Sequence, residues 1–217
     1  MLKVENLRTF NWEGALRGLR NPMNSWAKSD STFDENGNFI NIGENDLRLM
    51  KTLFKAGTEH RKYLRQIFVS MDITAPLYWI SELDTYKVGT VRNSCSFMHK
   101  GVSKPFEITD FSTHDTLIDG VPRNIETWKT ILDALNQLRE EYLATKDNNI
   151  FQQIRCLLPS GYNLRFTITM NYENVFTIIH QRSGHRLKEW NEFVDVLKTL
   201  PYVQELLSAL DEKETKQ

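Results

Sequence analysis

The chain has 217 residues, of which 40% are apolar and 25% charged, with a formal net charge of −1. These values are typical of an ordinary globular protein and argue against a strongly basic nucleic-acid-binding protein. Two cysteines without a CxxC pair argue against a disulfide framework and against a zinc site built on cysteine. The N-terminus lacks the pattern of a secretory leader, and no apolar run reaches the roughly 18 residues of a membrane span. We therefore expect a cytoplasmic protein with no membrane partner.

The first quarter of the chain is predicted to begin with extended backbone and to continue with a helix and a loop. Residues 2–10 fit either a short strand or an extended arm, and residues 12–26 predict a helix that ends near Pro22. Residues 28–45 are rich in Ser, Asp, Asn and Gly. Within them Asn36-Gly37 is a strong turn signal between aromatic and apolar residues, which predicts a small hairpin or a surface loop.

Three helices are expected next. Residues 46–56 place several apolar side chains on one helical face, and residues 59–69 form a second helix. A third helix begins at a cap residue, either Asp72 or Thr74, and continues through an apolar stretch.

The rest of the chain is predicted to hold loops, helices and one clear strand. Residues 84–99 favour extended or irregular backbone, and residues 100–122 favour a loop. A long helix with an apolar stripe begins at Asn124 and is followed by a helix over 150–158. A strand over 162–170 then leads to a helix over 172–181, which Asn171 caps. Two amphipathic helices over 187–199 and 201–210 precede a frayed tail. The predicted fold class is α+β, mostly helical with a small antiparallel sheet, in a single domain over residues 1–217.

A set of polar residues near the C-terminus predicts an anion-binding site. Arg155 precedes a Leu158-Pro159 stop, Asn171 follows at the start of a helix, and Arg182 ends that helix. The arginine fork suits a phosphate or a carboxylate, and a helix N-terminus offers backbone N–H groups to anions. From the residues alone, two structural salt bridges and a plain helix cap are the alternative.

This segment resembles the C-terminal motif block of the flavin-dependent thymidylate synthases. In that family an arginine precedes a Leu-Pro pair, a strand leads to an asparagine at a helix start, and the helix ends at an arginine followed by a turn with a histidine. The corresponding residues here are Arg155, Asn171, Arg182 and His185, with His185 one residue early. The resemblance covers most of the chain in element order and is specific over residues 154–192.

The resemblance implies the fold, the ligands and the reaction of that family. Its members transfer a methylene from methylenetetrahydrofolate to C5 of dUMP, reduced FAD supplies the hydride, and NADPH reduces the flavin again. The implied activity is that of an FAD-dependent thymidylate synthase, a methyltransferase that works as a homotetramer with active sites shared between subunits. By the same likeness Arg155 and Arg182 bind dUMP, Arg182 polarises it as the catalytic residue, and Asn171 and His185 contact FAD.

The central segment departs from the pattern of the family. The Arg-His-Arg triplet of the family falls on Asp84-Thr85-Tyr86, whereas the serine ten residues after its first arginine falls on Ser94. The arginine expected two residues beyond that serine is Ser96, and the glutamate expected two residues before it is Arg92. The histidine expected upstream is Leu64 in this register.

The same segment carries positive charge at other positions. This favours the interpretation that the cations of the site have moved, not that they have been lost. These cations are Lys87, Arg92, His99 and Lys100. We assign Arg92 and Ser94 to the nucleotide, and Tyr86 and Lys87 to the flavin side of the site. A place at the edge of a strand is the alternative for Tyr86 and Lys87.

Two other functions stay open. A divergent homologue keeps the fold and a nucleotide pocket but lacks the flavin reaction, or modifies another pyrimidine nucleotide. An unrelated helical interaction protein is the third possibility. No metal site is expected, because His180 and His185 have no third ligand nearby in the sequence. Ser94 and Cys95 lack a base in a recognisable pattern.

Overall fold

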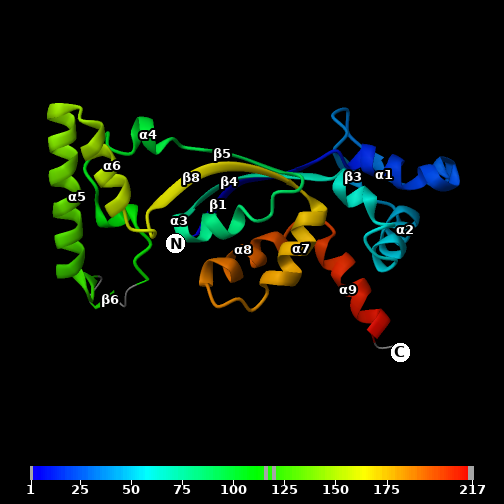
Figure 1. Cartoon of the computed structure of the whole chain (residues 1–217). Coiled ribbons are helices and arrows are strands. Elements are labelled where there is room, and N and C mark those ends of the chain that lie inside the picture. The colour runs from blue at the N-terminus through cyan, green and yellow to red at the C-terminus, as the bar shows by residue number, and fades with distance from the viewer. Residues whose placement is uncertain (1, 115–116, 119–120, 215–217) are drawn as a thin grey trace. The chain divides into compact units, whose positions relative to one another are not determined.

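A computed structural model gives the structure of the chain and describes residues 2–114, 117–118 and 121–214. The strands are β1 (Lys3–Phe10), β2 (Thr32–Phe33), β3 (Phe39–Asn41), β4 (Phe68–Pro76), β5 (Thr90–Ser94), β6 (Leu117–Ile118), β7 (Val121–Pro122) and β8 (Asn163–Asn171). The α-helices are α1 (Trp12–Arg20), α2 (Glu44–Lys55), α3 (Leu77–Leu83), α4 (Phe97–Lys100), α5 (Ile125–Thr145), α6 (Asn148–Leu157), α7 (Tyr172–Arg182), α8 (Lys188–Lys198) and α9 (Val203–Glu214) (Figure 1). Short 3-10 helices are η1 (Asn21–Met23), η2 (Trp26–Lys28), η3 (Lys62–Arg65) and η4 (Ile108–Asp110).

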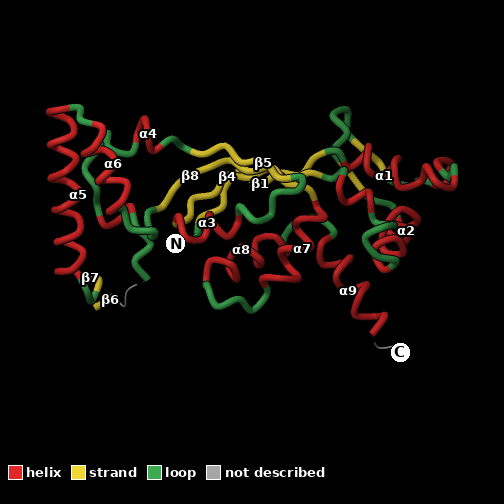
Figure 2. Tube along the Cα trace, in the orientation of Figure 1, coloured by secondary structure: helices red, strands yellow, loops and turns green. Residues whose placement is uncertain are grey.

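The main sheet has four strands in the order β1-β4-β8-β5, which run side by side in Figure 2. Two further pairs are antiparallel, β2 with β3 and β6 with β7. The hairpin of β2 and β3 confirms the turn predicted at Asn36-Gly37, where Gly37 has a φ of 74°. The predicted α+β class, mostly helical with a small antiparallel sheet, is confirmed.

The chain divides into two compact units. The first unit gathers Met1–Lys3, Ile73–Thr85 and Asn93–Phe166, and the second unit gathers Val4–Asp72, Tyr86–Arg92 and Thr167–Gln217. Each of β1, β4, β5 and β8 contributes residues to both units. The single domain over residues 1–217 stays a prediction.

The predicted helix over 59–69 and the helix start at Asp72 or Thr74 are wrong. Strand β4 covers this region from Phe68 onward, and α3 begins only after Pro76. In β4 every second side chain is buried, namely Val69, Met71, Ile73 and Ala75. A period of two is the pattern of a strand. The alternation of buried side chains therefore predicts this region better than the possible helix caps at Asp72 and Thr74.

In the first unit α5 and α6 lie side by side (Figure 1). The buried cluster beside them consists of Phe97, Val102, Phe106, Phe111, Leu135, Phe151 and Ile154. Asn124 precedes α5, as predicted. The predicted apolar stripe of α5 is buried less than expected, because Leu135 is 1% exposed whereas Trp128, Ile131, Leu132, Leu138 and Tyr142 are only partly buried.

Aromatic side chains fill the core of the second unit. Trp12 and Tyr172 are both at most 1% exposed, and their rings meet edge to face with centroids 5.3 Å apart. Phe54 and Phe176 lie with ring centroids 4.6 Å apart, and α2 packs against α9 while α7 packs against α8. Such rings bury large apolar areas and restrict how the helices pack.

Helix α7 begins and ends where the sequence predicted. Asn171 ends β8, and its Oδ1 accepts a hydrogen bond from the backbone N–H of Asn174 at 3.0 Å. Arg182 is the last residue of the helix. Helix α9 runs to Glu214, so the tail predicted to fray from residue 211 is helical as far as the structure describes it. The predicted tail residues 215–217, and residues 115–116 and 119–120 of the predicted loop, lie outside the described residues.

Among the described residues, no helix combines the length and the apolar character needed to cross a membrane.

Candidate functional site

Arg182 lies in a cage of aromatic and polar side chains within the second unit. Its guanidinium carbon lies 4.4 Å from the centroid of the Trp190 ring and 5.7 Å from that of Tyr86. Its Nε donates a hydrogen bond to the Tyr86 hydroxyl at 2.9 Å. Cation–π contacts of this kind contribute about 0.5–2 kcal/mol each. They hold the guanidinium in one orientation before any ligand binds.

The Tyr86 hydroxyl connects Arg182 to the neighbouring residue of α7. It accepts the hydrogen bond from Arg182 and donates one to Gln181 Oε1 at 3.0 Å. Tyr86 is 9% exposed, so this hydroxyl works largely shielded from water. The structure thus brings Tyr86, which the sequence assigned to the flavin side, into contact with Arg182, which it assigned to the nucleotide.

His185 faces Arg182 from the turn after α7. Its Nε2 lies 3.0 Å from Arg182 Nη1, and its Nδ1 accepts a hydrogen bond from the backbone N–H of Leu187 at 3.1 Å. A neutral imidazole has one acceptor nitrogen, and a guanidinium only donates. Arg182 Nη1 therefore donates to Nε2 in the tautomer whose Nε2 carries no proton. The contact places the imidazole of His185 directly beside the guanidinium of Arg182.

The N-terminal end of α7 is joined to the central segment of the second unit. Asn174 Nδ2 donates to the carbonyl of Val88 at 2.6 Å and to Thr90 Oγ1 at 2.8 Å. Gly89 has a φ of +73°, and a Cβ there would lie 2.3 Å from Asn171 Nδ2. A side chain there would be strained by the positive φ and would displace Asn171, so the position favours glycine. Through Asn174 and Arg182, both ends of α7 contact the stretch 86–92.

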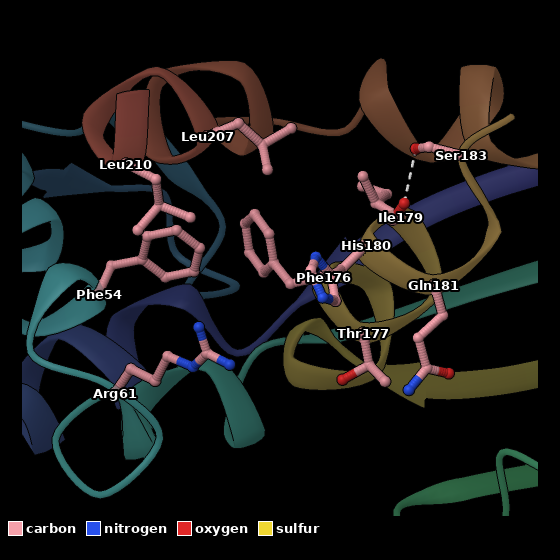
Figure 3. Close-up of a pocket in the computed structure, with 10 residues that line it drawn as sticks. All are labelled: Phe54, Arg61, Phe176, Thr177, Ile179, His180, Gln181, Ser183, Leu207 and Leu210. Atoms are coloured by element: carbon pink, nitrogen blue, oxygen red, sulfur yellow. Dashed lines mark hydrogen bonds between the residues drawn. The ribbon is translucent and has the colours of Figure 1, made fainter. Parts of the chain in front are cut away.

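A pocket of about 620 Å³ opens beside α7 in the second unit (Figure 3). Its apolar side consists of Phe54, Phe176, Ile179, Leu207 and Leu210, and its polar side consists of Arg61, Thr177, His180, Gln181 and Ser183. Figure 3 shows the leucines of α9 above the two phenylalanine rings and Arg61 below them. An apolar wall with a few polar groups is typical of sites for small organic molecules.

Arg61 is a cation of this pocket whose charge is already balanced. Its Nε and Nη2 donate to the carboxylate of Glu173 at 2.7 to 3.1 Å. Its guanidinium carbon lies 5.1 Å from the centroid of the Phe54 ring. Because a forked pair of this kind neutralises the arginine, the pocket suits a neutral ring better than an anion. Gln181 lines the pocket and also contacts Tyr86, so it connects the pocket to the cage.

Two buried tyrosines near these elements are structural donors. Burial raises the pKa of Tyr172, whose hydroxyl donates to the carbonyl of Pro201 at 3.2 Å. Burial also raises the pKa of Tyr63, whose hydroxyl donates to the carbonyl of Met50 at 3.0 Å. Both stay protonated at neutral pH and serve packing, not acid–base chemistry.

The other predicted site residues are divided between the units. Arg155 is exposed on α6 in the first unit, and its guanidinium carbon lies 4.8 Å from the centroid of the Phe97 ring. Ser94 ends β5, half-buried, in the same unit. Arg92 is half-buried in the part of β5 that belongs to the second unit, and Lys87 of that unit is exposed. The side chain of His99 lies outside what the structure describes.

Sequence reasoning missed three contributors to this site. Trp190 lies on α8, eight residues after Arg182, a spacing that no single helix explains. Arg61 and Glu173 are 112 residues apart in the chain, so no local pattern connects them. Within the described part of the chain, no group of three or more His, Cys, Asp or Glu residues could hold a metal ion.

Comparison with known proteins identifies similar structures but no similar sequences. No protein-family profile and no curated protein sequence match the chain. Thymidylate synthase X from Helicobacter pylori with FAD and dUMP aligns at a TM-score of 0.67 and 17% identity, over 97% of this chain and 99% of that one. A flavin-dependent thymidylate synthase from Helicobacter pylori complexed with FAD and dUMP aligns at 0.64 and 16%, over 97% and 98% of the two chains.

A UMP/dUMP methylase, PolB from Streptomyces cacaoi, bound with 5-Br dUMP, aligns at a TM-score of 0.62 and 14% identity. The alignment covers 96% of this chain and 95% of that one. At such identities the likeness shows the fold. The chain therefore has the predicted fold, that of a flavin-dependent thymidylate synthase.

Proposed function

We propose that the protein is an FAD-dependent enzyme that converts dUMP to dTMP, with methylenetetrahydrofolate as the carbon donor and NADPH as the reductant. The observation that carries this proposal is the cage around Arg182, formed by Tyr86, His185 and Trp190. It offers an ordered cation at the position that the sequence resemblance assigns to dUMP. The likeness to structures that contain FAD and dUMP supports it.

Arg182 is proposed to bind the nucleotide. A guanidinium that is ordered in the free protein loses little further entropy when a ligand binds. Its donors can make charge-assisted hydrogen bonds to a phosphate or to a pyrimidine carbonyl, and the same charge polarises the base at the reacting carbon. Tyr86 acts through Arg182, since its hydroxyl fixes the direction of the guanidinium.

Arg155 and Ser94 are proposed as a second part of the nucleotide site. They belong to the first unit, whereas Arg182 belongs to the second. The resemblance implies a homotetramer with shared active sites, in which the two parts come from different subunits. An exposed arginine such as Arg155 suits a contact that forms only on assembly or on binding.

The pocket in Figure 3 is proposed to hold the flavin ring. Its apolar wall fits a flat aromatic ring, and Thr177 and Gln181 can form hydrogen bonds at the edge of that ring. Because Glu173 neutralises Arg61, the pocket does not require an anionic ligand. FAD, when bound, supplies the hydride. Gln181 and Tyr86 then form a hydrogen-bonded connection between the flavin pocket and the nucleotide cage. Asn171, Lys87 and His185 stay predicted flavin contacts.

A nucleotide-binding homologue without the flavin reaction is the second candidate. Asp84-Thr85-Tyr86 stands where the family carries its Arg-His-Arg triplet, so two expected cations are missing there. The cage around Arg182 does not involve either of them, and nucleotide binding can therefore persist without the flavin.

The visible absorbance of the purified full chain separates the two functions. The enzyme is expected to be yellow or to take up added FAD, and to convert dUMP when methylenetetrahydrofolate and NADPH are supplied. A protein that takes up no FAD but melts at a higher temperature with dUMP is the second candidate. A protein that responds to neither ligand contradicts both.

A further inference from the structure

We propose that Gln181 is a positioning residue that couples the pocket in Figure 3 to the guanidinium of Arg182, so that a ligand in the pocket and dUMP at the cage strengthen each other's binding. The identity of the two ligands, FAD in the pocket and dUMP at the cage, rests on the proposed function. Gln181 lines the pocket, and its amide also contacts Tyr86. These residues all belong to the second unit.

The direction of each hydrogen bond between Arg182 and Gln181 follows from the chemistry of arginine. A guanidinium only donates, so Arg182 Nε donates to the Tyr86 hydroxyl over 2.9 Å. The single proton of that hydroxyl then goes to Gln181 Oε1, over 3.0 Å. With its oxygen engaged by Tyr86, the Gln181 amide presents its NH₂ group in another direction. The orientation of this amide is therefore set by Arg182, through Tyr86.

The NH₂ group of Gln181 complements the other polar groups of the pocket. The hydroxyl of Thr177 donates to the carbonyl of Glu173 at 2.9 Å, and the hydroxyl of Ser183 donates to the carbonyl of Ile179 at 2.6 Å. Both hydroxyl oxygens can still accept. Figure 3 shows the amide nitrogen of Gln181 on the side of Thr177 and its oxygen on the opposite side. A ring edge that carries a carbonyl beside an N–H, as a flavin has, matches this donor and acceptor.

A ligand that accepts from Gln181 is expected to strengthen the hydrogen bonds that lead to Arg182. Its carbonyl polarises the amide and makes Oε1 a better acceptor for the Tyr86 proton, which in turn makes the Tyr86 oxygen a better acceptor for Arg182. The guanidinium is then held more firmly in its cage, so that binding of dUMP orders it less. Because such a coupling is reciprocal, dUMP must tighten the binding of the pocket ligand by the same factor.

The backbone beside Tyr86 is held against the same helix. Asn174, in the first turn of α7, donates through Nδ2 to the carbonyl of Val88 at 2.6 Å and to Thr90 Oγ1 at 2.8 Å. Gln181 lies in the last turn of that helix. Since this contact restrains the backbone of the segment, a change at the Gln181 amide acts on the Tyr86 hydroxyl.

Calorimetric titration of the full chain with dUMP, without FAD and with saturating FAD, tests this coupling. We expect dUMP to bind more tightly when FAD is present, and Gln181→Met to reduce this tightening about threefold or more. Methionine keeps the length of the side chain but has neither the amide oxygen nor the N–H groups. Gln181 is exposed, so the variant should fold. A direct contact between the two ligands would act in both proteins alike.

Two further variants show whether the coupling passes through the proposed hydrogen bonds. Tyr86→Phe removes the hydroxyl between Gln181 and Arg182, so adding Gln181→Met to it should reduce the coupling no further. The matched control is Ser183→Ala, which changes another polar residue of the pocket, one whose hydroxyl donates to Ile179. This control should keep the coupling of the unmodified chain.

The outcomes separate this coupling from the proposed function. If both ligands bind but FAD does not tighten dUMP binding, or if Gln181→Met leaves the tightening unchanged, the coupling is overturned and the proposed function stands. The same holds if Ser183→Ala reduces the tightening as much as Gln181→Met does. If the unmodified chain does not bind FAD or does not bind dUMP, the proposed function fails, and the coupling fails with it.

Discussion

The two compact units differ in how they hold their cations. In the second unit Arg20, Arg61 and Arg182 are each engaged by carboxylate, hydroxyl or aromatic groups and are partly or fully buried. In the first unit Arg155 is exposed on a helix beside the Phe97 ring, and Lys104 pairs with a carboxylate while 62% of its side chain is exposed. Arg139 of the same unit is half-buried and donates to the carbonyl of Val102. A cation ordered by folding binds a ligand at little further entropic cost, whereas an exposed cation must be ordered on binding. Of the two arginines predicted to bind dUMP, Arg182 of the second unit is therefore the one that hydrogen bonds order before a ligand binds.

The largest expected effect comes from breaking the buried ion pair of the second unit. Asp46→Ala leaves Arg20 buried without its counter-charge, and it is expected to lower the free energy of unfolding by about 3–5 kcal/mol. Urea unfolding of the variant and of the unmodified chain measures this difference. A loss below about 1 kcal/mol would show that the second unit does not depend on its buried cation.

The same carboxylate should make stability depend on pH. Hydrogen bonds from Ser31, Ser29 and Arg20 lower the pKa of Asp46 despite its burial, so its contribution is fully present above the pKa of an unfolded aspartate, about 3.9. It is lost as the pH falls through the lower folded value. Asp46→Asn should therefore be less stable than the unmodified chain at neutral pH, and the difference should narrow in acid. A difference that is constant with pH contradicts an ionised Asp46.

The two arginines predicted to bind dUMP should not contribute equally. Arg182→Ala is expected to abolish the rise in melting temperature that dUMP causes, which corresponds to a loss of about 2 kcal/mol or more in binding. Arg155→Ala is expected to reduce that rise by less, because its side chain is not ordered beforehand by hydrogen bonds of the kind that hold Arg182. Equal losses would remove the distinction between the two units.

Tyr86→Phe should have an intermediate effect. The substitution keeps the ring beside Arg182 but removes the hydroxyl that joins Arg182 to Gln181. We expect the binding free energy of dUMP to weaken by about 1 kcal/mol, which is roughly fivefold in affinity. The free energy of unfolding should change by about the same small amount. Tyr78→Phe, in the first unit, is the control and should leave dUMP affinity unchanged.

The smallest effect is expected at the exposed pair of the first unit. Lys104 Nζ lies 2.7 Å from Asp110 Oδ1, and that hydrogen bond raises the pKa of Lys104. Surface pairs contribute about 0–1 kcal/mol, so Lys104→Ala should change the free energy of unfolding by about 0.5 kcal/mol or less. A loss as large as that of Asp46→Ala would remove the contrast between the two regions.

Local sequence signals predicted the fold where cap and periodicity agreed. Asn171 and Asn124 each precede a helix as expected, because the cap residue and the apolar period point to the same start. At β4 they disagreed. Asp72 is not a helix cap, since its carboxylate accepts hydrogen bonds from Asn6 and Thr167 on the neighbouring strands β1 and β8. Partners that distant in the chain leave no local signal.

The candidate site was predictable only in part, for the same reason. The spacing from Asn171 to Arg182 is local, and in the structure these residues cap and end the same helix, α7. Tyr86 lies 96 residues before Arg182, and it was assigned through the resemblance, not through any spacing that placed it against the guanidinium. Trp190 completes the cage from another helix, and only the packing of α8 on α7 brings it there.

The place of β8 in the main sheet sets the order in which the chain can fold. β8 lies between β4 and β5, although both precede it in the chain. During synthesis β5 emerges first and has no neighbour in this sheet until residues 163–171 have left the ribosome. Until then its edge, with Val91 74% exposed, is open to pairing with other chains. A nascent chain that stalls before β8 is therefore expected to aggregate, and the strand that delivers Asn171 to α7 also completes the sheet.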